Sequence, residues 1–201
     1  MIGTSAGGVE ALQTLTSQLP QDLPAAVFVV MHLLPSRQSL LPHILNRNGG
    51  IRSSHPKHHQ QQFEPGHVYV APPDFHLQVD PGNVLHLSRG PKENNFRPAI
   101  NVLFRSAAVA YRERVIGVIL TGTLEEGVTG LAWVKKYGGV AVVQDPHDAR
   151  FGDLPQNALE HVVADYVRPV AELAPLLVQL TNGVAPKELR PEGEKPTPWN
   201  T

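Results

Sequence analysis

The first residues of the chain place a serine between two glycines. Gly3-x-Ser5-x-Gly7 is the pattern of a nucleophile elbow, in which a serine stands on a tight turn between a strand and a helix. Glycine suits both flanking positions because a side chain there would collide with the crossing backbone, and because such turns hold dihedral angles that glycine tolerates best. Residues 9–19 carry apolar side chains at helical spacing, so the helix that an elbow needs is predicted.

The same glycines have a second reading, as a loop that cradles a phosphate ahead of a helix. A helix N-terminus attracts anions, and Gly3, Gly7 and Gly8 precede one here. The segment lacks the lysine of a P-loop and the spacing of a dinucleotide fingerprint. A serine hydrolase is the stronger interpretation only if a base and an acid lie elsewhere in the chain.

Two candidates for the base and the acid follow predicted strands. The apolar run 23–31 reads as a strand buried on both faces, and it ends at His32. Residues 115–120 read as another buried strand, followed by a loop with Glu125 and Glu126. Ligands of open α/β sheets bind at the carboxyl ends of the strands, so these side chains can meet Ser5. Taken alone, His32 would be interpreted as a surface or packing residue, and Glu125 is interpreted as a partner of a helix dipole.

Strands alternate with helices along the chain, which predicts an α/β fold with a doubly wound, mainly parallel sheet. The first strand is expected to be truncated, since only Met1 and Ile2 precede Gly3, and its neighbours would then keep unpaired backbone groups. The other predicted strands are 67–72, 75–79, 84–87, 139–145 and 165–170, the first three of them forming an antiparallel hairpin excursion. Helices are predicted at 39–46, 100–112 and 155–161. Two more are predicted after the loop 121–131, ending at residue 136, and after the strand 165–170, ending at about residue 180.

The predicted domain spans residues 1–182, and residues 183–201 are expected to be a disordered tail. That tail contains four prolines and almost nothing to bury. Residues 33–62 read as a polar stretch with one helix. His55, His58 and His59 lie in it close together, but a solvated loop is favoured over a metal site because no carboxylate or cysteine is interleaved.

Composition excludes several classes of protein. The net charge of −1 gives no electrostatic case for nucleic acid, and the longest apolar run, 25–31, is far too short to span a membrane. The chain has no cysteine, which removes disulfides and thiolate chemistry. We therefore expect a soluble, cytoplasmic protein that needs no metal or cofactor.

An ordered set of short motifs resembles the catalytic domain of the CheB-type protein-glutamate methylesterases of bacterial chemotaxis. The resemblance covers about residues 2–180. The motifs are Ile2-Gly-Thr-Ser-Ala-Gly-Gly8, Val29-Val-Met-His32, Val68-Tyr-Val-Ala-Pro72, Phe96-Arg-Pro98 with Asn101-Val-Leu-Phe104, Leu120-Thr-Gly-Thr123 through Leu131, and Gln144-Asp145.

The resemblance implies a serine hydrolase that demethylates glutamyl methyl esters on the cytoplasmic helices of chemoreceptors and often deamidates glutamines there. It assigns the nucleophile to Ser5, the general base to His32 and the acid to Glu126. The backbone amide of Thr123 would stabilise the oxyanion, with Ala6 after the nucleophile in the same set. Arg97 is a candidate for orienting the substrate, and equally for capping a loop.

The chain also departs from the family pattern. Glu126 stands where aspartate is general, Thr123 where methionine is usual, and Ala6 where some members have a hydroxyl. Asp153-Leu-Pro155 replaces a common glycine, methionine and proline at the rim. The sequence does not include the receiver domain that many family members carry ahead of the esterase, and we expect any control by phosphorylation to come from a separate regulatory protein.

Two alternatives remain at this point. The chain could be a weak or inactive member that only binds receptor or signalling partners. It could instead be an unrelated serine esterase, such as a patatin-like lipase, whose elbow can also read Gly-Thr-Ser-Ala-Gly. That family pairs its serine with the aspartate of an Asp-Gly dipeptide, and this chain has none.

Overall fold

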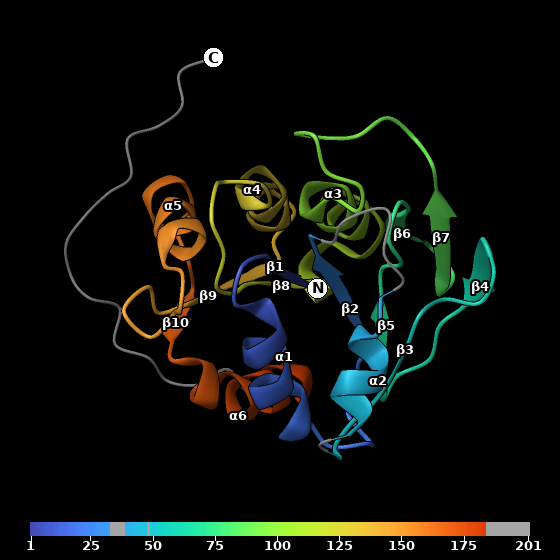
Figure 1. The fold of residues 1–201 in the computed structure, drawn as a ribbon, viewed down its shortest axis with the longest axis horizontal. Coiled ribbons are helices and arrows are strands. Elements are labelled where there is room, and N and C mark those ends of the chain that lie inside the picture. The colour runs from blue at the N-terminus through green and yellow to red at the C-terminus, as the bar shows by residue number, and fades with distance from the viewer. Residues whose placement is uncertain (33–38, 48, 184–201) are drawn as a thin grey trace.

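The computed structural model describes residues 1–32, 39–47 and 49–183. Within them the chain forms a parallel central sheet with helices on both faces, as predicted (Figure 1). In spatial order its strands are β10 (Tyr166–Arg168), β9 (Val140–Gln144), β8 (Ile116–Ile119), β1 (Ile2–Thr4), β2 (Val27–Met31), β5 (His67–Val70) and β3 (Arg52–Ser54).

The helices form two layers, one on each face of the sheet (Figure 1). One layer contains α3 (Ile100–Tyr111), α4 (Val128–Lys136) and α5 (Asp153–His161), and the other contains α1 (Gly8–Ser17), α2 (Leu41–Asn46) and α6 (Val170–Thr181). A short 3-10 helix, η1 (Arg112–Arg114), follows α3. Each layer closes its own apolar core against the sheet, and for this reason β2 is buried at every position.

The short first strand, β1, lies at the centre of the sheet. Ile2 pairs with Val29 of β2 on one side and with Val118 of β8 on the other. The ladder extends to Met1, whose amino group donates to the Ile116 carbonyl at 2.7 Å and whose carbonyl accepts from the Val118 amide at 2.8 Å. Ser5 therefore leaves the sheet at the carboxyl edge of its middle strand, between the ends of β2 and β8.

A hollow of about 340 Å³ lies at the opposite, amino end of these strands. It is lined by Met1, Val27, Phe63 and Ile116, among others. Burial in this region lowers the pKa of the Met1 amino group to about 5. The hollow is separated from Ser5 by the length of β1, so it is not part of the candidate site.

The structure corrects two predictions about the first half of the chain. Residues 67–70 form β5 of the parallel sheet rather than part of a hairpin. The antiparallel sheet consists instead of β6 (His76–Asp80), β7 (Val84–Ser88) and β4 (Gln60–Gln62). Strands β3 and β4 lie in the stretch predicted to be a polar loop with one helix. Both are three-residue edge strands without apolar alternation, so no periodicity marked them.

The predicted tail lies, apart from Gly183, outside the described residues, and its disorder stays a prediction. Among the residues that the structure does describe, none of the helices has the length and apolar character needed to cross a membrane.

The packing of β1 under α3 leads to a first prediction. A Cβ at Gly3 would lie 2.3 Å from Cγ2 of Ile100, and Ile100 is completely buried. Gly3→Ala should lower the free energy of unfolding by about 1–3 kcal/mol because Ile100 cannot move away. Urea denaturation measures this loss. Gly90→Ala is the control, since its nearest new contact is Ser88 Oγ at 3.8 Å, and it should change stability by less than about 0.5 kcal/mol. Equal midpoints for the two variants would contradict the argument.

Candidate active site

Ser5 stands on a tight turn between β1 and α1, as the glycine pattern predicts. Gly7 is the N-cap of α1 with φ 76°, a left-handed conformation that favours glycine. A Cβ on Gly7 would also lie within 3.2 Å of Thr121 Oγ1 and Phe151 Cδ2. The turn is held to the loop after β8 by a hydrogen bond from the Ser5 amide to the Thr121 carbonyl at 3.1 Å. These contacts leave the Ser5 side chain half-buried at the carboxyl edge of the sheet.

His32 follows β2 directly and bridges Ser5 and Glu126. Its Nδ1 lies 3.1 Å from Ser5 Oγ, and its Nε2 lies 2.7 Å from Glu126 Oε2. A carboxylate only accepts hydrogen bonds, so Nε2 carries the proton in the neutral imidazole and Nδ1 keeps a lone pair. That lone pair can accept the Ser5 hydroxyl proton. The His32 side chain is 7% exposed, so this arrangement is largely shielded from water.

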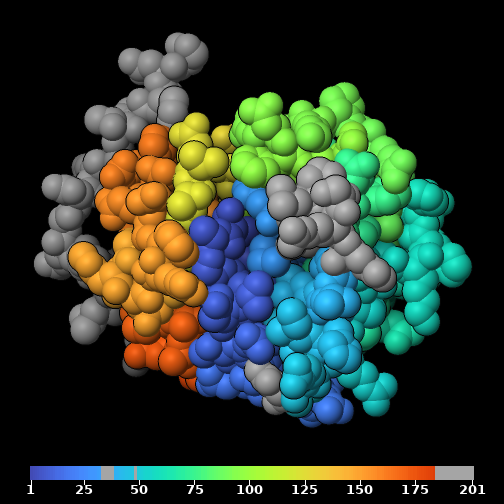
Figure 2. Space-filling view, viewed as in Figure 1, coloured from blue at the N-terminus to red at the C-terminus, as the bar shows by residue number. Residues whose placement is uncertain are grey.

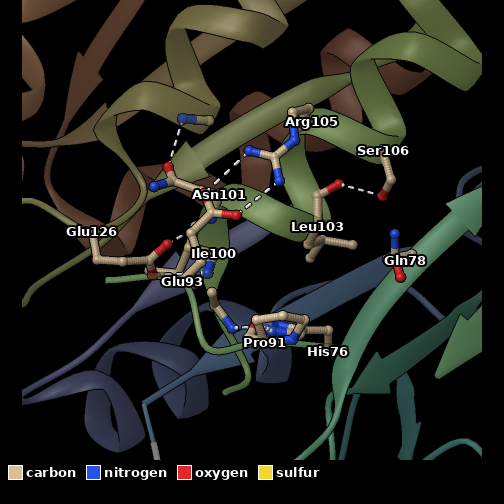
Figure 3. Close-up of polar contacts among 12 residues, drawn as sticks. His76, Gln78, Pro91, Glu93, Ile100, Asn101, Leu103, Arg105, Ser106 and Glu126 are labelled. Atoms are coloured by element: carbon tan, nitrogen blue, oxygen red, sulfur yellow. Dashed lines mark hydrogen bonds and ion pairs between the residues drawn. The ribbon is translucent and has the colours of Figure 1, made fainter. Parts of the chain in front are cut away.

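The carboxylate of Glu126 is buried and accepts three hydrogen bonds. Oε2 accepts from His32 Nε2 and from the Ile100 amide at 2.8 Å, and Oε1 accepts from the Asn101 amide at 2.8 Å. The two amides belong to the first turn of α3, whose N-cap residue has no side-chain cap of its own (Figure 3). Glu126 thus caps α3 from another part of the chain, and the helix dipole favours its negative charge. The adjacent Glu125 is exposed.

Helix α4 receives a cap in return from α3. Asn101 Oδ1 accepts the Gly130 amide at 2.6 Å, in the first turn of α4 (Figure 3). Gly127, the N-cap of α4, has no side-chain cap. The loop before α4 therefore caps α3 through Glu126, and α3 caps α4 through Asn101. This exchange locks the start of both helices against each other beside His32.

Hydrogen bonds of Thr121 fix the start of the loop that carries Glu126. The Thr121 amide donates to Gln144 Oε1 at 2.9 Å, and the Thr121 hydroxyl donates to the Ala6 carbonyl at 3.0 Å. The Phe151 amide in turn donates to the Thr121 hydroxyl at 2.9 Å. Three loops are joined in this way, and in the space-filling view the yellow and orange segments border the dark blue N-terminal segment (Figure 2).

Thr123 and Ala6 are the two residues whose backbone amides are predicted to bind the oxyanion. Ala6 follows the nucleophile in the turn ahead of α1, and Gly122 comes so close that a Cβ on it would lie 3.0 Å from Ser5 Cβ. Within the part of the chain that the structure describes, neither the Ala6 nor the Thr123 amide donates a hydrogen bond to protein. Among the described residues, both amides thus lack a protein acceptor that would compete with an oxyanion.

Arg97, the predicted substrate residue, is engaged within the protein. Its guanidinium donates to Asp74 Oδ1 from Nε at 3.0 Å and from Nη2 at 2.6 Å, and to the Gly90 carbonyl at 2.8 Å. The hydrogen bond from Arg97 lowers the pKa of Asp74. These contacts correspond to the loop-capping alternative, and a role in substrate binding stays a prediction.

Two of the three clustered histidines, His55 and His59, have hydrogen-bond partners within the protein. His55 places its Nδ1 2.9 Å from the Val70 carbonyl and its Nε2 3.2 Å from the Ser39 carbonyl. His59 Nδ1 lies 3.4 Å from the Leu87 carbonyl. Among the described residues there is no group of three or more histidine, cysteine, aspartate or glutamate side chains arranged to hold a metal ion.

The sequence reasoning did not assign roles to Phe96, Asn101 and Gln144, although all three lie in the quoted motifs. Asn101 and Gln144 are buried polar side chains, and each accepts a hydrogen bond from a backbone amide of the site. The one available signal was their polarity within otherwise apolar elements. That signal indicates a structural polar contact without identifying the partner.

Comparison with known proteins was consistent with these features. A sequence model described as CheB methylesterase matches residues 1–177. A relative from Leptospira interrogans is 36% identical over 180 residues, covering 90% of this chain and 93% of the relative. The protein-glutamate methylesterase/protein-glutamine glutaminase of Thermotoga maritima is 33% identical over 183 residues, and the match covers 90% of this chain but only 53% of that protein.

A solved structure gives the same result for the fold. The crystal structure of the Thermotoga maritima CheB methylesterase catalytic domain superposes with a TM-score of 0.83 and 33% identity. The match covers 89% of this chain and 96% of that one. This agreement includes the mainly parallel sheet with helices on both faces.

The capping role of Glu126 leads to a prediction about stability. In Glu126→Gln one carboxylate oxygen becomes an NH₂ group, which cannot accept from either α3 or His32. The variant should lose about 1–3 kcal/mol in free energy of unfolding, because a buried donor is left without an acceptor. Glu125→Gln is the matched control at an exposed position and should be unchanged. Equal urea midpoints for both variants would show that the α3 amides do not depend on this carboxylate.

Proposed function

The chain belongs to the CheB methylesterase family, and on that premise we propose that it is a serine hydrolase that removes methyl groups from glutamyl methyl esters of chemoreceptors. The observation that carries the proposal is His32, bridging Ser5 and Glu126 at 3.1 and 2.7 Å. The relatives' names include a glutaminase activity, so deamidation of receptor glutamines by the same serine is part of the proposal. The substrate helices are cytoplasmic parts of receptors, which would place this enzyme in the cytoplasm.

The reaction follows from the positions of the three side chains. Ser5 Oγ attacks the ester carbonyl carbon, and its proton passes to His32 Nδ1. Glu126 holds the resulting imidazolium through Nε2–H. The tetrahedral oxyanion accepts hydrogen bonds from the amides of Ala6 and Thr123. The intermediate collapses when the carbon–oxygen bond to methoxide breaks, and methoxide takes the proton from Nδ1 and leaves as methanol.

The second half of the reaction regenerates the enzyme. Water attacks the glutamyl–Ser5 ester while His32 Nδ1 takes a proton from it. The new tetrahedral intermediate expels Ser5 Oγ, which recovers the proton from His32. The glutamic acid product loses its remaining proton to solvent and is released as the carboxylate. With a glutamine substrate the leaving group is ammonia instead of methanol. These steps use only groups of the protein, its substrate and water.

Receptor binding without catalysis is the competing proposal. The assay of methanol release described in the next paragraph decides between the two proposals. A regulatory partner, such as a separate receiver protein, remains a prediction about activation and does not alter the reaction.

The nucleophile is tested by methanol release from a methylated receptor fragment. Ser5→Ala should reduce release to the uncatalysed level, because the acyl intermediate cannot form. Ser17→Ala is the control, since that hydroxyl lies on α1 and bonds the Thr14 carbonyl at 3.1 Å, and it should keep wild-type turnover. A wild-type chain that binds the fragment without releasing methanol would favour the binding-only alternative. Unchanged turnover in Ser5→Ala would rule out the serine mechanism.

The acid is tested separately by charge and by length. Glu126→Gln removes the charge that stabilises the imidazolium and should lower kcat by about 10⁴-fold, the scale seen when a triad loses its carboxylate. Glu126→Asp keeps the charge one methylene shorter and should stay within about tenfold, or about 1.4 kcal/mol, if the loop adjusts. Thr123→Ala retains the backbone amide and serves as the control with near-normal kcat. Similar wild-type activity in both Glu126 variants would move the acid elsewhere, Glu125 being the first candidate.

A further inference from the structure

The imidazole of His32 is covered on one face by the ring of Phe96. The two ring centroids are 3.7 Å apart and the planes meet at 11°, a close stacked contact. The hydrogen bonds to Ser5 and Glu126 both lie at the edge of the imidazole, at opposite nitrogens. They restrain the ring along the line that joins the two nitrogens but leave it free to tilt about that line. A flat side chain against the face blocks this remaining motion.

Phe96 is itself fixed by a two-residue turn. The amides and carbonyls of Glu93 and Phe96 exchange hydrogen bonds of 3.1 and 2.9 Å across Asn94 and Asn95. Both asparagines have positive φ, 49° and 68°, as the central residues of a type I′ turn do. Asparagine tolerates this conformation better than most residues, so the sequence is suited to the turn.

Two ion pairs clamp the turn on either side of Phe96. Arg105 of α3 donates to both carboxylate oxygens of Glu93, at 3.1 and 2.8 Å (Figure 3), and this contact lowers the pKa of Glu93, so that the pair is ionised at neutral pH. On the other side Arg97 holds Asp74. Helix α3 therefore anchors Glu126 through its first-turn amides, and it anchors the turn that carries Phe96 through Arg105.

We infer that Phe96 is a positioning residue of the reaction, one that holds the His32 ring in the plane of its two hydrogen bonds. The inference rests on the proposed function, in which His32 is the base. The stacked face acts a second time when His32 becomes an imidazolium, because the negative face of an aromatic ring favours an adjacent cation. Phe96 has no group that can make a bond or transfer a proton in this reaction, so its effect passes through the imidazole on which it stacks.

A graded set of variants separates a flat ring from simple apolar cover. Phe96→Tyr keeps the ring, Phe96→Leu keeps apolar volume without a flat face, and Phe96→Ala removes both. We expect Tyr to stay within about threefold of wild type, and Leu and Ala to lose about ten- to a hundredfold in kcat with little change in KM, part of the 10²–10⁴ that a positioned base supplies. Phe63→Leu is the control, since Phe63 lies beside the hollow at the far end of the sheet.

A spectroscopic readout tests the same inference without turnover. The His32 Nε2 proton, hydrogen-bonded to Glu126, gives a downfield proton resonance that broadens once the ring tilts and the proton exchanges with water. It should be sharp in the wild type, Phe96→Tyr and Phe63→Leu, and broadened in Phe96→Leu, with circular dichroism confirming that each variant is folded.

The two readouts have separate meanings. A Phe96→Leu variant with wild-type kcat, or one that loses kcat no more than Phe96→Tyr does, overturns the inference. A sharp resonance in Phe96→Leu overturns it as well. If the wild type releases no methanol, the proposed function fails, and the resonance alone still decides whether Phe96 positions the imidazole.

Discussion

The arrangement of the site depends on one buried carboxylate. Glu126 is 2% exposed, and a charge so deeply buried is tolerated only when its hydrogen bonds are satisfied. Two of its three donors are backbone amides of α3, so the carboxylate cannot move without uncapping that helix. The third donor is His32. The position of His32, the proposed base, is therefore tied to the packing of a helix on the sheet, and not to a flexible pair of side chains.

The parallel order of the strands explains how the other parts of the site, Ser5, His32 and the Thr121 loop, come together. β1, β2 and β8 are neighbours in the sheet and run in the same direction, so the residues that follow them emerge at one edge. Ser5, His32 and the Thr121 loop are those residues. The starts of α3 and α4 lie against this edge and cap each other. Asn101 of α3 accepts the Gly130 amide of α4, and Glu126, just before α4, accepts the first amides of α3. The proposed active site thus lies where the sheet edge and the starts of two helices meet.

The sequence revealed the parts of this site that strand ends determine, and not the parts that loops determine. Ser5 could be placed from the glycines on either side of it, and His32 from the buried apolar strand that it follows. The loop after a third strand offered both Glu125 and Glu126, and the family resemblance chose Glu126. Phe96 could not be placed, since its position over His32 depends on a turn and on Arg105. Arg97 looked equally suited to a substrate and to a loop, and only the fold shows Asp74 as its partner, 23 residues away in sequence. The edge strands β3 and β4 are only three residues long, and most of their side chains are polar and exposed or half-buried. They therefore carry no apolar period that would mark them in the sequence.

The structure of the loop that carries Glu126 explains why a glutamate, and not the shorter aspartate, fits at this position. The loop is fixed at its start, where Thr121 holds Ser5 and Gln144, and at its end, where a Cβ on Gly127 would lie 2.9 Å from Ile100 Cγ2. Between these points Leu124 adopts φ 70° with its side chain 59% exposed, and Asn157 Nδ2 donates to its carbonyl at 3.0 Å. A non-glycine residue keeps such a conformation only where its surroundings impose it. Between the two ends of the loop, the side chain at position 126 must span the distance to α3 and His32. The glutamate carboxylate does so with three hydrogen bonds of 2.7–2.8 Å.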